Sequence, residues 1–226
     1  MSVNVIAIDG PAASGKSTIA RLLSERLGAA YVSTGAMYRA VAWKALQAGI
    51  DGSKVSEQSI EPILKKLQMS YAPGADGKFA LKVDGKFPDH ELHTPEVSAL
   101  VSKVAALPNV REAMKKLQRA MAGAGTIIME GRDIGTCVFP DAKIKFFLTA
   151  SPLVRAQRRL AQGGEAPDGA TVEAVAKEID ARDEMDYKRP IAPLKQAEDA
   201  TLIDSSGLEI EETLQKMLEI AARSKS

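Results

Sequence analysis

Residues 10–17 read Gly10-Pro11-Ala12-Ala13-Ser14-Gly15-Lys16-Ser17. The spacing is G-x-x-x-x-G-K-[ST], the pattern of a phosphate-binding loop, and it lies between the apolar run 3–8 and a helical pattern over 16–27. A strand, such a loop and a helix direct several backbone N–H groups at one anion. Lys16 is expected to reach the β- and γ-phosphates of a nucleotide, and the Ser17 hydroxyl to bind Mg²⁺. The sequence therefore predicts a nucleoside triphosphate site formed by residues 10–17 and the adjoining Thr18.

Composition argues against several other classes of protein. The chain has 226 residues, 45% of them apolar, so it can bury a substantial core. With 30 basic and 29 acidic residues the net charge is +1, which argues against nucleic acid or a membrane surface as the main partner. Cys137 is the only cysteine, which excludes an internal disulfide and fits a reducing compartment. We find no transmembrane run and no signal-peptide pattern, and we expect a cytoplasmic protein.

Strand-like and helix-like segments alternate along the chain. Five short apolar runs predict strands at 3–8, 30–33, 126–129, 144–148 and 201–203. The alternation is typical of an α/β fold, in which helices cover both faces of a central parallel sheet, here five-stranded. We expect a single domain over residues 1–226. Ligands of such sheets bind at the carboxyl ends of the strands, so the residues that follow each run have priority as site residues.

Two segments interrupt this alternation. Segment 66–93 holds Asp76-Gly77 and Asp84-Gly85, dipeptides favoured in tight hairpin turns. Together with the apolar residues around them they predict a small antiparallel meander, within an inserted subdomain at 62–95. The second segment, 163–169, is rich in glycine between two helical patterns. It predicts a mobile lid over 155–170.

Charged residues gather at the predicted strand ends and on two helices. Arg39 lies just past the second strand, and Arg132 and Asp133 follow the third. A helix that begins at Ser151-Pro152 carries three arginines at spacings of three and four, which we interpret as an unpaired cluster that awaits an anion; they are Arg155, Arg158 and Arg159. A later helix over 172–188 places Arg182, Asp186 and the following Arg189 on one stripe. Each set has an alternative as a solvated face or an intramolecular ion pair.

These motifs together resemble the cytidylate kinase family, a group of nucleoside monophosphate kinases, over nearly the whole chain. The resemblance rests on the phosphate-binding loop and on four further motifs: residues 34–39 (TGAMYR), 108–112 (PNVRE), 131–140 (GRDIGTCVFP) and 182–194, where Arg182-Asp183 leads to Arg189-Pro190-Ile191-Ala192-Pro193-Leu194. The inserted meander also resembles the monophosphate-binding region of this family. The resemblance implies a P-loop kinase that transfers a phosphoryl group from ATP to CMP or dCMP with Mg²⁺, and it implies a monomer.

The resemblance also implies roles for individual residues. The acceptor site would be made by Thr34, Tyr38, Arg39, Arg111, Arg132, Asp133, Arg182, Asp186 and Arg189. Within it, Thr34, Arg111 and Asp133 would contact the cytosine edge. Arg39 and Arg132 would hold the acceptor phosphate, and Arg182, Asp186 and Arg189 would lie near the ribose and phosphates. Catalysis would depend on Lys16, Arg132, Arg155, Arg158, Arg159 and Arg182.

Two residues depart from the family pattern. Many relatives carry an acidic residue where this chain has Ser33, and an aspartate where it has Glu130. Either carboxylate would organise magnesium-bound water, and here only Glu130 is available for that task. Its side chain is longer than that of aspartate by one methylene group.

Three other readings of the sequence stay open. A related small-molecule kinase would use a different acceptor. A GTPase switch would usually carry an Asn/Thr-Lys-x-Asp motif, and the nearest match, Leu81-Lys82-Val83-Asp84, lacks its first residue. A scaffolding protein with a degenerate nucleotide site is disfavoured by the intact Lys16 and Ser17.

Overall fold

The computed structural model describes residues 4–74, 79–123, 125–162 and 169–223. Within these residues the chain forms two compact units. The first takes in residues 4–33, 119–162 and 169–223, and the second takes in residues 34–118. The predicted Asp76-Gly77 turn and most of the glycine-rich part of the predicted lid, residues 163–168, lie outside the described residues.

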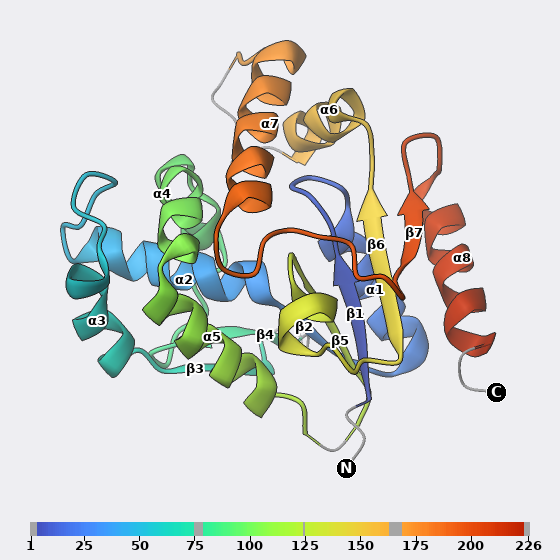
Figure 1. Ribbon diagram of the computed structural model, residues 1–226, viewed down its shortest axis with the longest axis horizontal. Coiled ribbons are helices and arrows are strands. Elements are labelled where there is room, and N and C mark those ends of the chain that lie inside the picture. The colour runs from blue at the N-terminus through green and yellow to red at the C-terminus, as the bar shows by residue number, and fades with distance from the viewer. Residues whose placement is uncertain (1–3, 75–78, 124, 163–168, 224–226) are drawn as a thin grey trace. The chain divides into compact units, whose positions relative to one another are not determined.

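The first unit is built on a parallel sheet that has five strands among the described residues, in the order β2-β5-β1-β6-β7 (Figure 1). The strands are β1 (Val5–Asp9), β2 (Ala30–Ser33), β5 (Ile127–Gly131), β6 (Ile144–Thr149) and β7 (Thr201–Asp204). All five overlap the predicted runs, and the predicted fold class is confirmed. The central strands β1, β5 and β6 are buried along nearly their whole length, which explains their continuous apolar sequences.

Helices α1 (Lys16–Leu27) and α8 (Ile210–Arg223) cover one face of this sheet. Ile6 and Ile8 of β1 point to that face and join a core with Leu23 of α1 and Met217 of α8. The predicted bounds of α1 are confirmed, and Gly28 ends it in the left-handed conformation, with φ 59°. The far end of α1 from the phosphate-binding loop therefore lies against α8.

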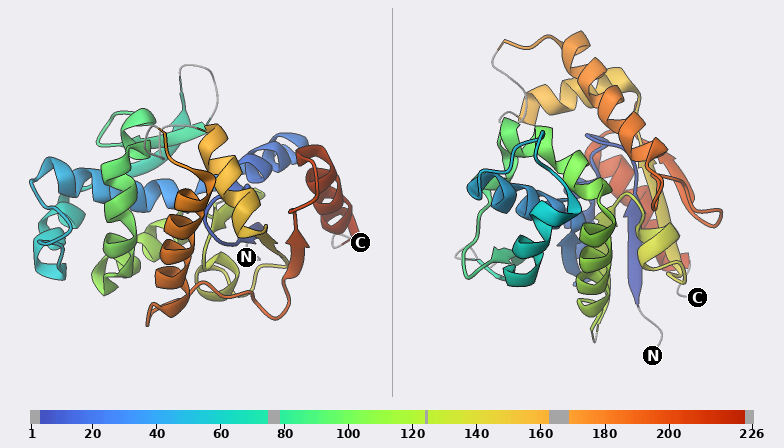
Figure 2. Two further views of the ribbon diagram at one scale, coloured as in Figure 1. Left: turned by 90° about the horizontal axis from the view of Figure 1, so that it is seen from above. Right: turned by 60° about the vertical axis from the view of Figure 1, so that its left-hand side comes forward.

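Helices α6 (Pro152–Gln162) and α7 (Val172–Lys188) pack against each other in the same unit (Figure 2). The hydroxyl of Ser151 accepts a hydrogen bond from Val154 N at 3.4 Å, and that of Thr171 accepts one from Ala174 N at 3.2 Å. Both helices thus begin at side-chain caps. The predicted α7 bounds are confirmed, and the helix ends two residues before Pro190.

The second unit contains α2 (Thr34–Gln47), α3 (Glu57–Lys66), α4 (Pro95–Ala106) and most of α5 (Pro108–Ala120). It also contains the hairpin of β3 (Met69–Pro73) and β4 (Phe79–Val83) and a 3₁₀-helix η1 (His90–His93). No helix in either described unit has the length and apolar character needed to cross a lipid bilayer.

The predicted meander is wrong in its third strand. Asp84 and Gly85 do form a two-residue turn with positive φ (47° and 85°), closed by hydrogen bonds between Val83 and Lys86. Beyond the turn the pairing consists of one isolated bridge, Val83 to Lys86. Pro88 follows two residues later and lacks the N–H that continued pairing needs.

We predict that Gly10→Ala strongly destabilises the first unit. Gly10 has φ 153°, and a Cβ there would lie 2.0 Å from the Leu148 carbonyl oxygen of β6, which is backbone and cannot rotate away. The expected loss in free energy of unfolding is at least about 3 kcal/mol, measured by urea denaturation.

The matched control is Gly28→Ala. Gly28 also has positive φ (59°), but a Cβ there meets no atom within 4 Å. Its loss should be about 1 kcal/mol, from backbone strain alone. Equal losses for the two variants would contradict the close approach of Gly10 to β6.

Candidate active site

The phosphate-binding loop connects the central strand β1 to the N-terminus of α1. Ala13 (φ 55°) and Gly15 (φ 89°) adopt the left-handed conformation, as expected of a loop whose N–H groups converge on an anion. The Lys16 ammonium donates hydrogen bonds to Pro11 O at 2.7 Å and to Ser14 Oγ at 3.3 Å. The loop and the positive end of α1 together form an anion site whose lysine lies folded against the loop.

Lys16 is buried, and burial lowers the pKa of its ammonium group to about 7, with a further lowering by the charge of Arg132. The carboxylates of Glu130, Asp183 and Asp9 act in the opposite direction. An anion bound by the loop would favour the charged lysine again.

Glu130, at the end of β5, accepts two hydroxyl hydrogen bonds at its Oε1 atom. Ser17 Oγ donates at 3.0 Å and Ser33 Oγ at 2.5 Å. Burial raises the pKa of the nearby Tyr31 phenol, and the charge of Glu130 raises it further. The hydrogen bond from Ser17 shows that the Glu130 side chain, one methylene group longer than that of aspartate, reaches the phosphate-binding loop. We call these three residues (Ser17, Ser33 and Glu130) the hydroxyl–carboxylate cluster.

The hydroxyl–carboxylate cluster fits Mg²⁺ better than a metal held by protein ligands alone. No group of three or more His, Cys, Asp or Glu side chains arranged to hold a metal occurs among residues 4–74, 79–123, 125–162 and 169–223. Mg²⁺ is commonly bound by one or two oxygen side chains together with substrate phosphates. Ser17 and Glu130 offer such a donor set beside the loop.

Arg132 and Asp133 follow β5 and are joined to the end of α7 by ion pairs. Arg132 Nε donates to Asp186 Oδ2 at 3.0 Å, and Arg189 Nη2 donates to Asp133 Oδ1 at 3.3 Å. Arg189 Nη1 also lies 3.7 Å from Asp186 Oδ1. Burial disfavours the charge of Arg132, but the neighbouring carboxylates outweigh it, and the net effect is a raised pKa. The structure thus brings four of the predicted acceptor-site residues together.

Helices α6 and α7 hold the phosphate-binding loop by its backbone at Ala12. Ala12 N donates to Asp183 Oδ1 at 2.9 Å, and Ala12 O accepts from Arg155 Nη1 at 3.1 Å. Arg155 also pairs directly with Asp183, and both side chains are buried. We call Ala12, Arg155 and Asp183 the loop clamp.

The prediction that the α6 arginines form an unpaired cluster is wrong for Arg155 and Arg158. Arg155 belongs to the loop clamp, and Arg158 donates to Ser14 O at 3.2 Å and to Ser205 O at 2.8 Å. The reason is that α6 packs beside the loop and β7, where backbone carbonyl groups need donors. The third arginine of the set, Arg159, is buried on the same helix.

Sequence reasoning missed Asp183, although the signal was present. Val175, Ile179, Asp183 and Asp186 lie at spacings of four, four and three, so the two aspartates continue the buried stripe of α7. An acidic residue at a core position needs a buried partner, and Arg155 supplies it. Arg182 lies on α7 one turn before Asp186.

The remaining predicted residues belong to the second unit. The Arg111 guanidinium lies 5.7 Å from the centre of the Tyr38 ring and donates to Ala105 O at 3.3 Å. Arg39 Nη1 donates to Leu92 O at 3.0 Å and to Ser98 Oγ at 2.9 Å. Thr34 is buried at the first position of α2. Their roles stay predictions.

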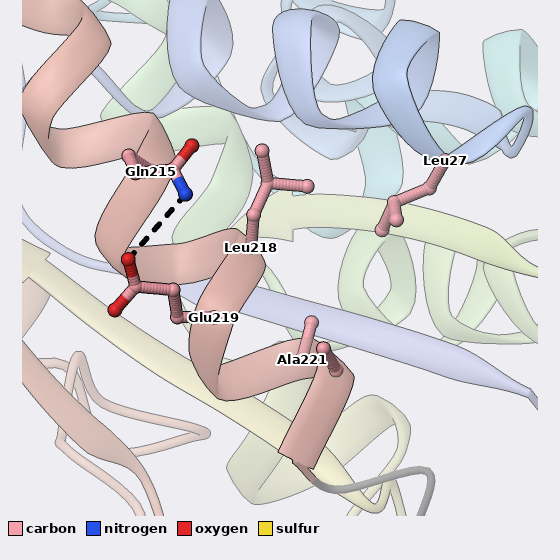
Figure 3. A pocket seen from close by; sticks show the side chains of 6 residues that line it. Leu27, Gln215, Leu218, Glu219 and Ala221 are labelled. Carbon is pink, nitrogen blue, oxygen red and sulfur yellow. Dashed lines mark hydrogen bonds between the residues drawn. The ribbon is translucent and has the colours of Figure 1, made fainter.

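A hollow in the first unit lies at the far end of α1 from the phosphate-binding loop (Figure 3). It is lined by Leu27 of α1 and by Gln215, Leu218, Glu219, Ala221 and Ala222 of α8. This lining includes no basic side chain, so the hollow is not suited to a phosphate group.

The sheet order, and the anion-binding loop after the central strand, place the chain among the phosphate-loop nucleotide-binding proteins. Shikimate kinase from Bacteroides thetaiotaomicron shares the fold in its crystal structure, with a TM-score of 0.51, 13% identity and coverage of 96% of this chain and 98% of that one. The family model described as cytidylate kinase matches residues 6–223. The chain belongs to the cytidylate kinase family.

Relatives support this assignment over nearly the whole chain. A cytidylate kinase of Carboxydothermus hydrogenoformans is 46% identical over 222 residues, 96% of this chain and 97% of that protein. A cytidylate kinase of Pelotomaculum thermopropionicum is 45% identical, over 94% of this chain and 93% of that protein. A bifunctional pantoate ligase/cytidylate kinase of Prochlorococcus marinus is 43% identical over 96% of this chain, which matches 44% of that longer protein.

We predict that Asp183→Ala destabilises the protein by about 3 kcal/mol, because it removes the buried carboxylate partner of Arg155 and leaves only the more exposed Asp180, 3.3 Å away. Urea denaturation measures the loss. Glu184→Ala is the matched control, since Glu184 is the next residue of α7 and pairs with Lys188 on the exposed surface. This control should leave stability unchanged. A similar midpoint for both variants would show that the loop clamp contributes little.

Proposed function

We propose that the chain transfers the γ-phosphoryl group of ATP to CMP, with dCMP as a second acceptor, giving ADP and CDP or dCDP. The observation that carries the proposal is the arrangement after β5. Arg132 and Asp133 follow a central strand at the same sheet edge as the phosphate-binding loop, and Asp186 and Arg189 pair with them. An arginine that would hold the acceptor phosphate and a carboxylate that would read the base are thereby adjacent in one unit.

On the donor side, the loop N–H groups and Lys16 hold the triphosphate. Ser17 would bind Mg²⁺ and Glu130 would orient its water ligands, and the ion would neutralise charge on the β- and γ-phosphates. The loop clamp holds the loop backbone so that its N–H groups need little reorganisation when the triphosphate binds.

On the acceptor side, Asp133 would accept a hydrogen bond from the cytosine amino group. Uracil presents a carbonyl oxygen at that position, which would face the carboxylate unfavourably. Arg189 Nη2 donates to Asp133 Oδ1 at 3.3 Å and helps to orient this side chain. Thr34, Tyr38 and Arg111 would complete base recognition, Arg39 and Arg132 would hold the monophosphate, and Arg182 and Asp186 would lie near the ribose.

The chemical step needs alignment and charge neutralisation more than a catalytic base. The acceptor phosphate is already an anionic nucleophile at neutral pH. Lys16, Arg132, Arg159 and Arg182 would stabilise charge on the transferring group. The contacts of Arg155 and Arg158 favour a role in holding the phosphate-binding loop. A lid over 155–170 would exclude water from the site as it closes, and closure would adjust these contacts. A cytoplasmic location and a monomeric state stay predictions.

We predict that Asp133→Ala weakens the preference for CMP over UMP by roughly 10- to 100-fold, the equivalent of one charge-assisted hydrogen bond. The measurement is kcat/KM with CMP, dCMP, UMP and AMP in a coupled ADP-release assay. Equal rates with CMP and UMP in the parent protein would contradict the assignment of Asp133. Preference for another monophosphate would overturn the proposed acceptor.

We predict that binding of Mg-ATP at pH 8 takes up roughly one proton through Lys16. The lysine pKa of about 7 leaves it mostly neutral at this pH, and the triphosphate restores its charge. At pH 6 the lysine is already charged, so uptake should nearly vanish. Calorimetric titration in buffers of different ionisation enthalpy measures the uptake. Lys16→Met corrects for protons bound by the nucleotide, and an undiminished uptake in this variant would contradict the prediction.

A further inference from the structure

The π-helix η2 (Ile134–Val138) begins directly after Asp133 and is held at its N-terminus by a side chain from β1. The Asp9 carboxylate accepts from Ile134 N at Oδ1 and from Gly135 N at Oδ2, both at 2.8 Å. π-Helical turns are rare and frequently occur at functional sites. Asp9 therefore serves a backbone element that adjoins the proposed base-reading residue.

A second charged side chain holds the opposite end of η2. Arg119 Nε donates to Val138 O at 2.8 Å, and Arg119 Nη2 donates to Cys137 O at 3.1 Å. The negative Asp9 carboxylate at the N-terminal N–H groups and the positive Arg119 guanidinium at the C-terminal carbonyl groups both complement the dipole of the turn. Two charged residues remote from each other in sequence thus fix one short turn.

The peptide unit between Asp133 and Ile134 is held on both sides. Its N–H, from Ile134, donates to Asp9. Its carbonyl, from Asp133, accepts from Cys137 N at 2.9 Å and from Val138 N at 3.1 Å. Rotation of this unit would redirect the Asp133 side chain and would break bonds at both of its ends.

The Asp9 carboxylate is well suited to hold the two N–H groups of η2, although its burial costs free energy of solvation. Side chains alternate along β1, so Asp9 points away from the face that Ile8 shares with α1 and α8. Burial raises its pKa to about 7, against the two N–H bonds that favour the carboxylate. A carboxylate accepts at both oxygens, whereas an amide places a donor at one of them. Space is tight as well, because a Cβ on Gly135 would lie 3.4 Å from Asp9 Oδ2 and 3.1 Å from Lys145 Cδ.

We propose that Asp9 and Arg119 are positioning residues for base recognition: they fix η2, and thereby the direction of Asp133, so that they control discrimination between CMP and UMP without touching either nucleotide. The inference rests on the proposed function. It gives Asp9, which directly precedes the phosphate-binding loop, a task on the acceptor side of the reaction.

The test compares Asp9→Asn and Arg119→Met with the parent protein. We expect the ratio of kcat/KM for CMP to that for UMP to fall by about 10- to 100-fold in Asp9→Asn and in the same direction in Arg119→Met, because a small misplacement of an aligned group has an effect of this size. The KM for ATP should change less than about twofold in Arg119→Met, since this variant leaves the loop clamp and the carboxylates around Lys16 unchanged. If Asp9→Asn fails to fold, the CMP to UMP ratio of Arg119→Met alone decides the test.

Met217→Ala is the matched control for a merely structural effect. Met217 of α8 is fully buried in the core on the sheet face that Ile8 shares with α1 and α8, and Asp9 points away from that face. This variant should lower the melting temperature and leave the CMP to UMP ratio unchanged.

The outcomes separate the two proposals. A parent protein with no preference for CMP overturns the proposed function and, with it, this inference. A parent that prefers CMP, with an unchanged ratio in both Asp9→Asn and Arg119→Met, overturns only the positioning role. A ratio that falls equally in Met217→Ala also overturns it, because general loosening of the first unit would then explain the effect.

Discussion

The phosphate-binding loop must keep the N–H groups that face its ligand open, so these groups cannot hold the loop in place by bonding to its own backbone. The loop clamp meets this constraint from outside, with Asp183 at Ala12 N and Arg155 at Ala12 O. At Gly10 the constraint is steric, because a Cβ there would clash with the Leu148 carbonyl oxygen. The donor side of the site therefore depends on helices that follow the loop by well over a hundred residues.

Residues of opposite charge are buried together at one edge of the sheet in the first unit, and burial shifts their pKa values. Asp9 and Lys16 are both pushed toward their neutral forms, each with a pKa of about 7, while the carboxylates around Arg132 keep its guanidinium charged. Fixed charges in a dry environment interact strongly with an incoming phosphate and need little rearrangement when it arrives. The protein thus carries an electrostatic cost in folding that a polyanionic ligand offsets.

Much of the fold could be predicted from the sequence, because apolar strands and helical periodicity are local signals. The loop motif, the five strands and helices α1 and α7 follow from such signals. The third strand of the meander could not be judged locally, since a proline two residues past a correct turn decides it. The partners of Arg155, Asp183 and Arg119 depend on which elements pack together, and short-range spacing does not contain that information. The proposed role of Asp9 could not be predicted from the sequence, because its two hydrogen bonds go to backbone N–H groups over a hundred residues away.

The strand order has a consequence for synthesis on the ribosome. β1 and β2 emerge first but are not neighbours in the sheet, since β5 lies between them and Ala30 pairs with Ile127. At translation rates of about 5–20 residues per second, the apolar β1 waits roughly 6–24 seconds for its first partner, β5. Residues 34–118 form a compact unit of their own and can begin to fold during this interval. The nascent chain must meanwhile shield an unpaired hydrophobic strand, which makes early translation the stage most exposed to aggregation and most dependent on chaperones.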